Sequence, residues 1–182
     1  MSRFSLVTSE LEALADIKEA SLLETRDFKP LTVEKKREPP QTRHITFELT
    51  RKTLNPDGVT RNLLVVNGEY PGPTIEANLG DTISVTVVNN IDHPKEGTSI
   101  HWHGLPQRET PWADGVPSVT QCPIASGSNF TYTFTPDVAG TTWWHAHFTA
   151  QYTDGLFGAL IIHGSEYAEN YDIDVGPILL VS

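Results

Sequence analysis

From residue 44 onward, apolar and polar residues alternate along short segments that turn residues separate. The alternating apolar positions, which have the period of half-buried strands, are Ile45, Phe47, Leu49, then Ile83, Val85, Val87, then Phe130, Tyr132 and Phe134. Continuous apolar runs at 63–66, 160–162 and 178–181 predict strands buried on both faces. About eight to ten short strands with no convincing helix between them predict an all-β fold, a Greek-key sandwich.

The first forty residues follow a different pattern. Residues 9–24 contain the only plausible helix, which Ser9 and Glu12 would cap. Lys35, Lys36 and Arg37 then precede two prolines, as in an exposed linker. We therefore expect residues 1–43 to form a poorly ordered or short helical extension, and residues 44–182 to form the globular domain.

The charge and the hydropathy of the chain exclude two classes of partner. The net charge is −10, and residues 53–182 carry fourteen acidic but only three basic side chains. Such a surface repels phosphate backbones, so we expect no nucleic-acid partner. No apolar run approaches the length of about 18 residues that spans a bilayer, so we expect no membrane partner either. Glu10, Glu12 and Asp16 interrupt the place where a secretion signal needs an apolar core.

Histidine supplies the candidate chemistry. Four of the seven histidines form two His-x-His pairs, His101 with His103 and His145 with His147. In a strand, residues i and i+2 lie on one face, about 6.5 Å apart, so each pair presents two imidazoles side by side. Neutral imidazoles without clustered carboxylates suit copper or zinc, and the spacing alone does not choose between them. The spacing suits either two ligands on one metal or one ligand on each of two neighbouring metals. The two pairs could meet if their strands are neighbours in the sandwich; the alternative is that the histidines alternate by chance.

The sequence around these pairs resembles one known family. HWHGLPQRETPWADGVPSVTQCPI and GTTWWHAHFTAQYTDGLFGALIIHG are similar to the two copper signatures in the first domain of multicopper oxidases. VNGEYPGPTIEANLGDTISVTVVNN and DVGPILLVS are similar to the family's early strands and to the strand that closes this domain. In detail, these four segments resemble ascomycete laccase-like enzymes most, and QRETPWADG is also similar to ascorbate oxidases. The resemblance implies that residues 44–182 are a cupredoxin (plastocyanin-like) domain, the first domain of such an oxidase.

The resemblance also implies roles for individual residues. His101 would bind a type 2 copper, and His103, His145 and His147 would bind a type 3 pair. Asp114 matches a catalytic carboxylate that relays protons during oxygen reduction, although an Asp before Gly115 is also a common turn residue. The single cysteine, Cys122, matches one that bridges to a later domain.

The family's full activity requires more than this chain holds. The type 1 copper site and four further cluster histidines have no counterpart here, so we expect the missing C-terminal cupredoxin domains of the same protein to supply them. The family couples oxidation of a phenolic donor to reduction of O2, and we expect the isolated chain not to do so. The chain would then be a fragment or a truncated gene product; a stand-alone copper-binding protein and a self-assembling subunit are the alternatives.

The sequence leaves the full-length activity and the location of the protein open. Laccase, ascorbate oxidase and pigment-pathway oxidase remain possible as the full-length activity. The resemblance implies an extracellular enzyme, whereas the written N-terminus carries no export signal. His44, His93 and His163 lack a paired spacing, and we expect them to be solvated or structural.

Overall fold

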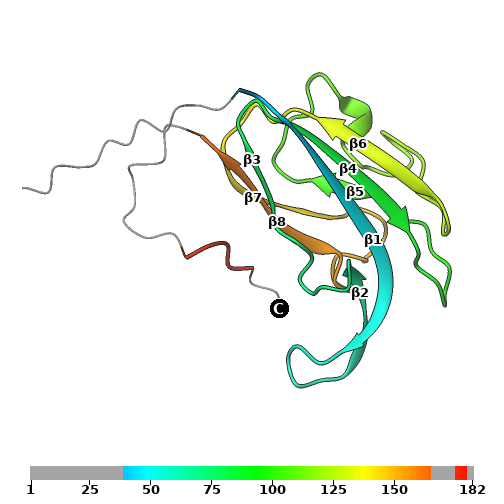
Figure 1. Ribbon diagram of the computed structural model, residues 1–182. Coiled ribbons are helices and arrows are strands. Elements are labelled where there is room, and N and C mark those ends of the chain that lie inside the picture. Colours follow the sequence, from blue (N-terminus) through cyan, green and yellow to red (C-terminus); the bar gives the residue numbers. More distant parts are fainter. Residues whose placement is uncertain (1–38, 165–174, 180–182) are drawn as a thin grey trace, which may run out of the picture. The chain divides into compact units, whose positions relative to one another are not determined.

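The computed structural model describes residues 39–164 and 175–179, and residues 42–163 fold into two layers of β-sheet (Figure 1). Eight strands and one short 3-10 helix, η1, make up the regular structure of this part. In chain order they are β1 (Thr42–Leu54), β2 (Arg61–Val66), β3 (Ile75–Asn78), β4 (Thr82–Asn89), β5 (Ile100–Trp102), η1 (Pro111–Ala113), β6 (Asn129–Phe134), β7 (Gly140–Ala146) and β8 (Phe157–His163). The predicted all-β class is confirmed.

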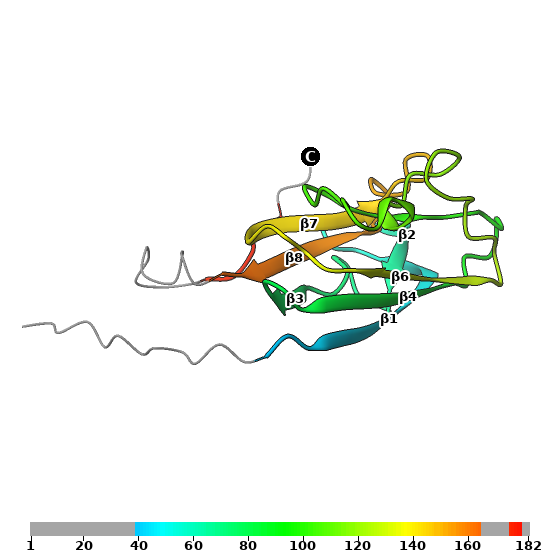
Figure 2. The ribbon, with the colours of Figure 1, turned by 90° about the horizontal axis from the view of Figure 1, so that it is seen from above.

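The two sheets contain four strands each. One sheet has the order β2-β1-β4-β6 and the other has the order β3-β8-β7-β5. β1 runs parallel to β4 and β3 runs parallel to β8, so the chain crosses between layers before it returns beside an earlier strand. Figure 2 shows β7 and β8 in one layer and β1 and β4 in the other. The predicted β-sandwich is confirmed.

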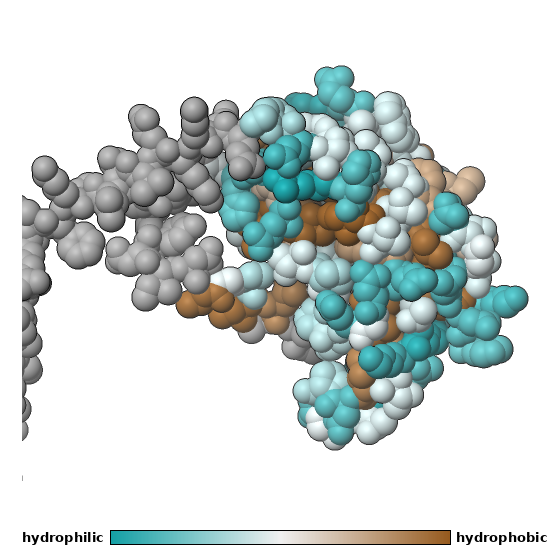
Figure 3. Space-filling model, in the orientation of Figure 1, coloured by the Kyte–Doolittle hydropathy of each residue, from teal (hydrophilic) through white to brown (hydrophobic). Residues whose placement is uncertain are grey.

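β4 illustrates why these segments become strands. Val85 and Val87 point into the core and are fully buried, as the alternating pattern predicts. Thr86, the residue between them, faces outward, and its hydroxyl lies 2.9 Å from that of Thr131 on β6. On the face that Figure 3 displays, polar side chains cover most of the surface and apolar ones show in a strip between them.

Trp144 anchors the core at the centre of β7. Its indole is fully buried, contacts the ring of Phe47 at a centroid distance of 4.6 Å, and donates from Nε1 to the carbonyl of Pro73. Two glycines make room for it: a Cβ at Gly72 or Gly158 would lie 2.5 Å from the indole. Because Trp144 fixes β7 from the inside, the neighbouring residues of β7 are held on the opposite face.

Three sequence-based expectations concern the N-terminal and C-terminal segments of the chain. The helix predicted at 9–24 lies outside the described residues. The first strand begins at Thr42, two positions before the expected start of the domain.

The run 178–181 was expected to be a buried strand. For its described part this is wrong, because 175–179 contain no strand and Ile178 is 75% exposed. An apolar run becomes a strand only where a sheet edge accepts its backbone hydrogen bonds, and the described part of this run is not a strand of either four-stranded sheet.

Among the described residues, no helix has the length and apolar character needed to cross a bilayer.

Candidate metal centre

The two His-x-His pairs lie on neighbouring antiparallel strands. β5 pairs with β7 so that His101 stands directly opposite His145. The pairing continues beyond the end of β7, where the amide of His147 donates to the carbonyl of Ser99 at 3.0 Å. The sandwich thus brings together two segments that the sequence keeps far apart.

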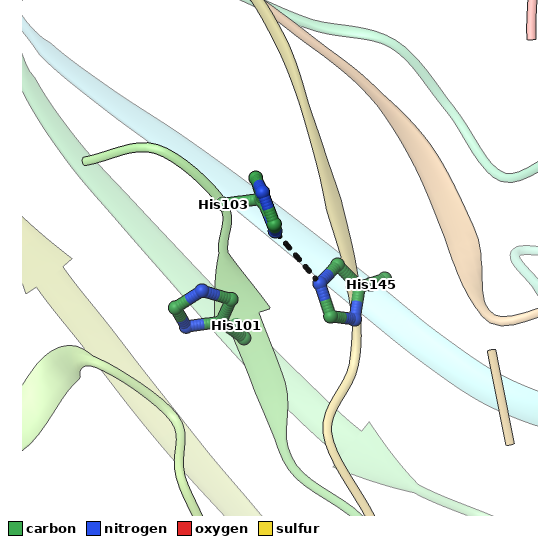
Figure 4. Close-up of side chains that lie close together, drawn as sticks. All are labelled: His101, His103 and His145. Carbon is green, nitrogen blue, oxygen red and sulfur yellow. Dashed lines mark hydrogen bonds between the residues drawn. The ribbon is translucent and has the colours of Figure 1, made fainter. Parts of the chain in front are cut away.

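The imidazole rings converge on one space. One candidate ligand nitrogen from each of His101, His103 and His145 lies within 4.8 Å of the other two, and Figure 4 shows these three rings close together. The ring centroid of His147 lies 5.4 Å from that of His101 and 6.1 Å from that of His145. All four predicted side chains therefore gather at one site.

The spacing of the nitrogens fits a bound metal ion. Nδ1 of His103 lies 3.4 Å from Nε2 of His145 (Figure 4). Two imidazole nitrogens bound at about 2.0 Å to one tetrahedral ion would be about 3.3 Å apart. A set of imidazoles suits copper or zinc, so the donor set and its geometry fit copper.

Backbone carbonyls orient two of the rings. Nδ1 of His101 lies 2.6 Å from the carbonyl oxygen of Asp114, and Nδ1 of His145 lies 2.9 Å from that of Ala146. A carbonyl only accepts, so each Nδ1 carries the proton and each Nε2 keeps its lone pair. His101 and His145 can therefore bind a metal through Nε2, whereas His103 directs Nδ1 toward His145.

His145 is the most deeply placed of the four rings. Burial is the main cause that lowers its pKa to about 4; the hydrogen bond to Ala146 opposes this shift, and the nearby charges of His101, His103 and His147 add to it. His145 is therefore neutral at pH 7. A neutral imidazole binds a metal without first losing a proton.

Aromatic side chains cover the ring of His145. The indole of Trp143 stacks on it at a centroid distance of 4.1 Å, and Tyr152 approaches edge-on at 5.9 Å. Trp143 also contacts the ring of His103, at 5.3 Å. These contacts restrict the rotation of both imidazoles and keep water from one side of His145.

Asp114 lies beside His101 because of a close backbone approach. Asp114 ends η1, and the following Gly115 has a φ of +80° and packs so tightly that a Cβ would lie 1.8 Å from the carbonyl oxygen of Ile100. Any side chain at Gly115 would push this turn away from β5. The approach leaves the Asp114 carboxylate 3.4 Å from Nδ1 of His101, with 29% of its side chain exposed. The turn interpretation and the position beside the histidines are both compatible with this geometry.

A buried tyrosine holds β5 from the other layer. The hydroxyl of Tyr132, on β6, accepts the amide of Ile100 at 3.0 Å. Burial raises the pKa of Tyr132 to about 12, so the hydroxyl stays protonated at every physiological pH.

The remaining candidate residues lie apart from the four rings. His163 pairs with Glu76 at 3.1 Å, His93 is 93% exposed beside Asp92, and His44 is an exposed residue of β1. Cys122 is exposed and unpaired in the described part of the chain.

Two supporting features were not foreseen from the sequence. The backbone carbonyl of Asp114, rather than its side chain, makes the shortest contact with His101. Gln151 is 2% exposed and its side chain hydrogen-bonds to Glu96 and Gly97, although it was not among the candidate residues predicted from the sequence. A glutamine inside a histidine signature was the available signal.

A family model described as multicopper oxidase matches residues 48–167, which include both histidine pairs. The chain belongs to the multicopper oxidase family. The match covers every described strand except the first residues of β1. Membership of this family identifies copper as the metal that the histidine cluster implies.

Similar proteins agree with this assignment. Laccase-2 of Botryotinia fuckeliana is 51% identical over 139 residues, which are 76% of this chain and 23% of that protein. The oxidoreductase ptaE of Pestalotiopsis fici is 48% identical over 147 residues, 80% of this chain and 24% of that protein. The crystal structure of a laccase from Botrytis aclada matches with a TM-score of 0.67 and 49% identity, over 70% of this chain and 23% of that one. The multicopper oxidase chain described here thus spans about a quarter of the length of the curated relatives it matches, and its fold is cupredoxin-like.

Proposed function

We propose that residues 44–182 are the copper-binding first cupredoxin domain of a laccase-like multicopper oxidase, and that they supply half of the histidines of its three-copper cluster. The observation that supports this most directly is the convergence of His101, His103 and His145, with nitrogens within 4.8 Å of one another, and of His147 beside them. Chance alternation of histidines gives no reason for two pairs to meet across a strand ladder.

Each ring has a defined role in the proposal. His101, whose Nε2 keeps its lone pair, would hold the type 2 copper. His103, His145 and His147 would hold the type 3 pair. When bound, copper would supply one-electron transfer to oxygen. Trp143 and Tyr152 hold His145 in orientation and exclude water beside it.

Asp114 is assigned as the proton-relay residue. Reduction of O2 to water consumes protons, so a proton donor near the copper ligands is chemically required, and a carboxyl group can serve as one. The Asp114 carboxylate is both near His101 and partly open to solvent, so it can take a proton at Oδ1 from water and pass it inward. Its own backbone carbonyl fixes the Nδ1–H tautomer of His101, so one residue orients the ligand and carries the proton.

The remaining parts of the oxidase are assigned to further domains of the same protein. The relatives are about four times as long as the segment matched here, which leaves room for the type 1 copper and the other cluster histidines. The full-length protein would oxidise phenol-type donors and reduce O2, as the laccase names among its relatives suggest. Exposed Cys122 is available to bond with one of those domains.

Copper loading of the 182-residue chain tests the proposal. We expect bound copper with nitrogen hyperfine structure in electron paramagnetic resonance, no type 1 signal, and no sustained oxygen consumption with a phenol. His101→Ala and His145→Ala should each reduce the bound copper, whereas His93→Ala, an exposed histidine away from the cluster, should not. A chain that retains no copper after loading, or one with a type 1 spectrum, would contradict the proposal.

A further inference from the structure

We propose that Gln151 is a positioning residue that holds the backbone of His147 in place for copper, an inference that rests on the proposed function. Gln151 makes no contact with the histidine rings. It acts through a largely buried hydrogen-bonded clamp that joins the loop after His147 to the segment before His101. The clamp consists of Arg51, Glu96, Thr98 and Gln151.

His147 needs such support more than the other three histidines. β7 ends at Ala146, so the strand ladder reaches His147 only through its amide, which donates to the carbonyl of Ser99. Within the described residues its ring makes no hydrogen bond, whereas those of His101 and His145 each bond to a carbonyl. The position of the His147 ring therefore depends on the loop that follows it.

Gln151 is the centre of that loop. Its amide donates to the carbonyl of Phe148, and its carbonyl accepts the amides of Asp154 and Leu156. The loop closes where the amide of Ala146 donates to the carbonyl of Leu156 at 2.8 Å. Residues 147–156 thus fold around the backbone of Gln151.

The side chain of Gln151 fixes this loop to the segment before β5. Nε2 donates to the carboxylate of Glu96 at 2.9 Å and to the carbonyl of Gly97 at 3.0 Å. Oε1 accepts the hydroxyl proton of Thr98 at 2.8 Å. Both amide protons and the amide oxygen are therefore used, and with Gln151 2% exposed and Thr98 fully buried, water cannot replace these bonds.

An ion pair orients the clamp from β1. Arg51 donates to the other carboxylate oxygen of Glu96 at 2.6 Å, and only 14% of the arginine side chain is exposed. Because Glu96 receives Arg51 on one oxygen and Gln151 on the other, its carboxylate has one orientation. The clamp thus ties the loop after His147 to β1 and to residues 96–98, which lead directly into Ser99, the partner of the His147 amide.

The first test needs no copper. In the metal-free 182-residue chain we expect Thr98→Val, which removes only the hydroxyl, to speed hydrogen exchange at the His147 amide about tenfold while the amides within β7 keep their protection. Thr98→Ser retains the hydroxyl and should restore slow exchange. Equal exchange at His147 in all three proteins would overturn the proposal.

The second test measures copper affinity by competition with a chromophoric chelator. Gln151→Ala should weaken binding about tenfold or more, as loss of a supporting interaction behind a metal ligand does. The matched control is Asp81→Asn, which breaks a similarly buried clamp at the opposite end of β8, near Asn78 and His163. It should leave the affinity unchanged even where it lowers the melting temperature as much as Gln151→Ala does. Equal weakening by both variants would overturn the proposal.

A double-mutant cycle separates positioning of His147 from general loosening of the chain. In a His147→Ala background, adding Gln151→Ala should change copper affinity by less than about twofold, because the ligand that the clamp positions is already absent. A further tenfold loss in that background would overturn the proposal. If the wild-type chain binds no copper, the proposed function fails, and the exchange measurement still decides whether the clamp holds His147.

Discussion

The two faces of the β5–β7 ladder differ in composition although the same short stretch of paired backbone carries both. The inner face consists of apolar side chains that are all fully buried, namely Ile100, Trp102, Trp144 and Ala146. The outer face carries the four histidines, of which His103 and His147 are exposed. Because successive residues of a strand point to opposite faces, stability and metal chemistry are placed on alternate residues of one ladder. Mutations should therefore separate the two properties by position alone.

The largest effect is expected on the inner face. Trp144→Ala should lower the free energy of unfolding by about 3–5 kcal/mol, because it opens a cavity between Phe47, Gly72 and Gly158 that the rigid sandwich cannot close. Chemical denaturation of the metal-free chain measures this. Trp143→Ala, one residue away on the histidine face, is the matched control. If the two variants lose the same stability, the separation of the two faces fails.

The corresponding substitution on the outer face should lower the affinity for copper. His145→Ala should weaken copper binding by more than about 100-fold, since changes behind a ligand alone cost about 10–100-fold. The same variant should lower the free energy of unfolding by no more than about 2 kcal/mol, because it loses one hydrogen bond to Ala146 and its contacts with Trp143. Chelator competition and denaturation on one sample give both numbers. A loss of stability without a loss of copper affinity would reverse the assignment of this face.

A pH-dependent contribution to stability is expected away from both faces. Burial of Asp81 alone would raise its pKa, but the amides of Gln41 and Asn78 and the guanidinium of Arg43 together hold it below the ordinary value of 3.8. A depressed folded-state pKa stabilises the native state above pH 3.8, and this contribution disappears as the pH falls through the folded-state value. Asp81→Asn should therefore cost about 1–3 kcal/mol at pH 7 and progressively less in acid. Denaturation at a series of pH values measures the difference, and a constant difference down to pH 2 would contradict it.

The smallest expected effect is on the pKa of His145, whose ring lies under the side chains of Trp143 and Tyr152. Burial is the main cause of the low pKa of His145, about 4, and the Trp143 indole stacks directly on this ring. Trp143→Ala should therefore raise the pKa from about 4 toward 6.5, with Tyr152 still covering part of the ring. Titration of the His145 ring by nuclear magnetic resonance measures the shift. Tyr132→Phe, a change in the core on β6, should leave it unmoved, and an unmoved pKa in Trp143→Ala would show that other groups bury the ring.

Local sequence predicted much of the fold because strand periodicity is a local property. Val85 and Val87 alternate with polar residues whatever the rest of the chain does, and they became the inner face of β4. The same local logic was wrong for the described part of 178–181, because an apolar run needs a sheet edge to pair with, and pairing is a property of the whole fold. The helix predicted at 9–24 lies outside the described residues and stays a prediction.

The sequence by itself determined which residues carry the chemistry: two His-x-His pairs in strands, in signatures specific enough to indicate the family. Only the tertiary structure decided that His101 stands opposite His145, that the carbonyl of Asp114 sets the tautomer of His101, and that Gln151 closes a buried clamp behind His147. The physical reason is that ligand identity and spacing follow from covalent geometry along one strand. Register, ring orientation and burial arise from contacts between segments that are distant along the chain, and these form only when the sandwich closes.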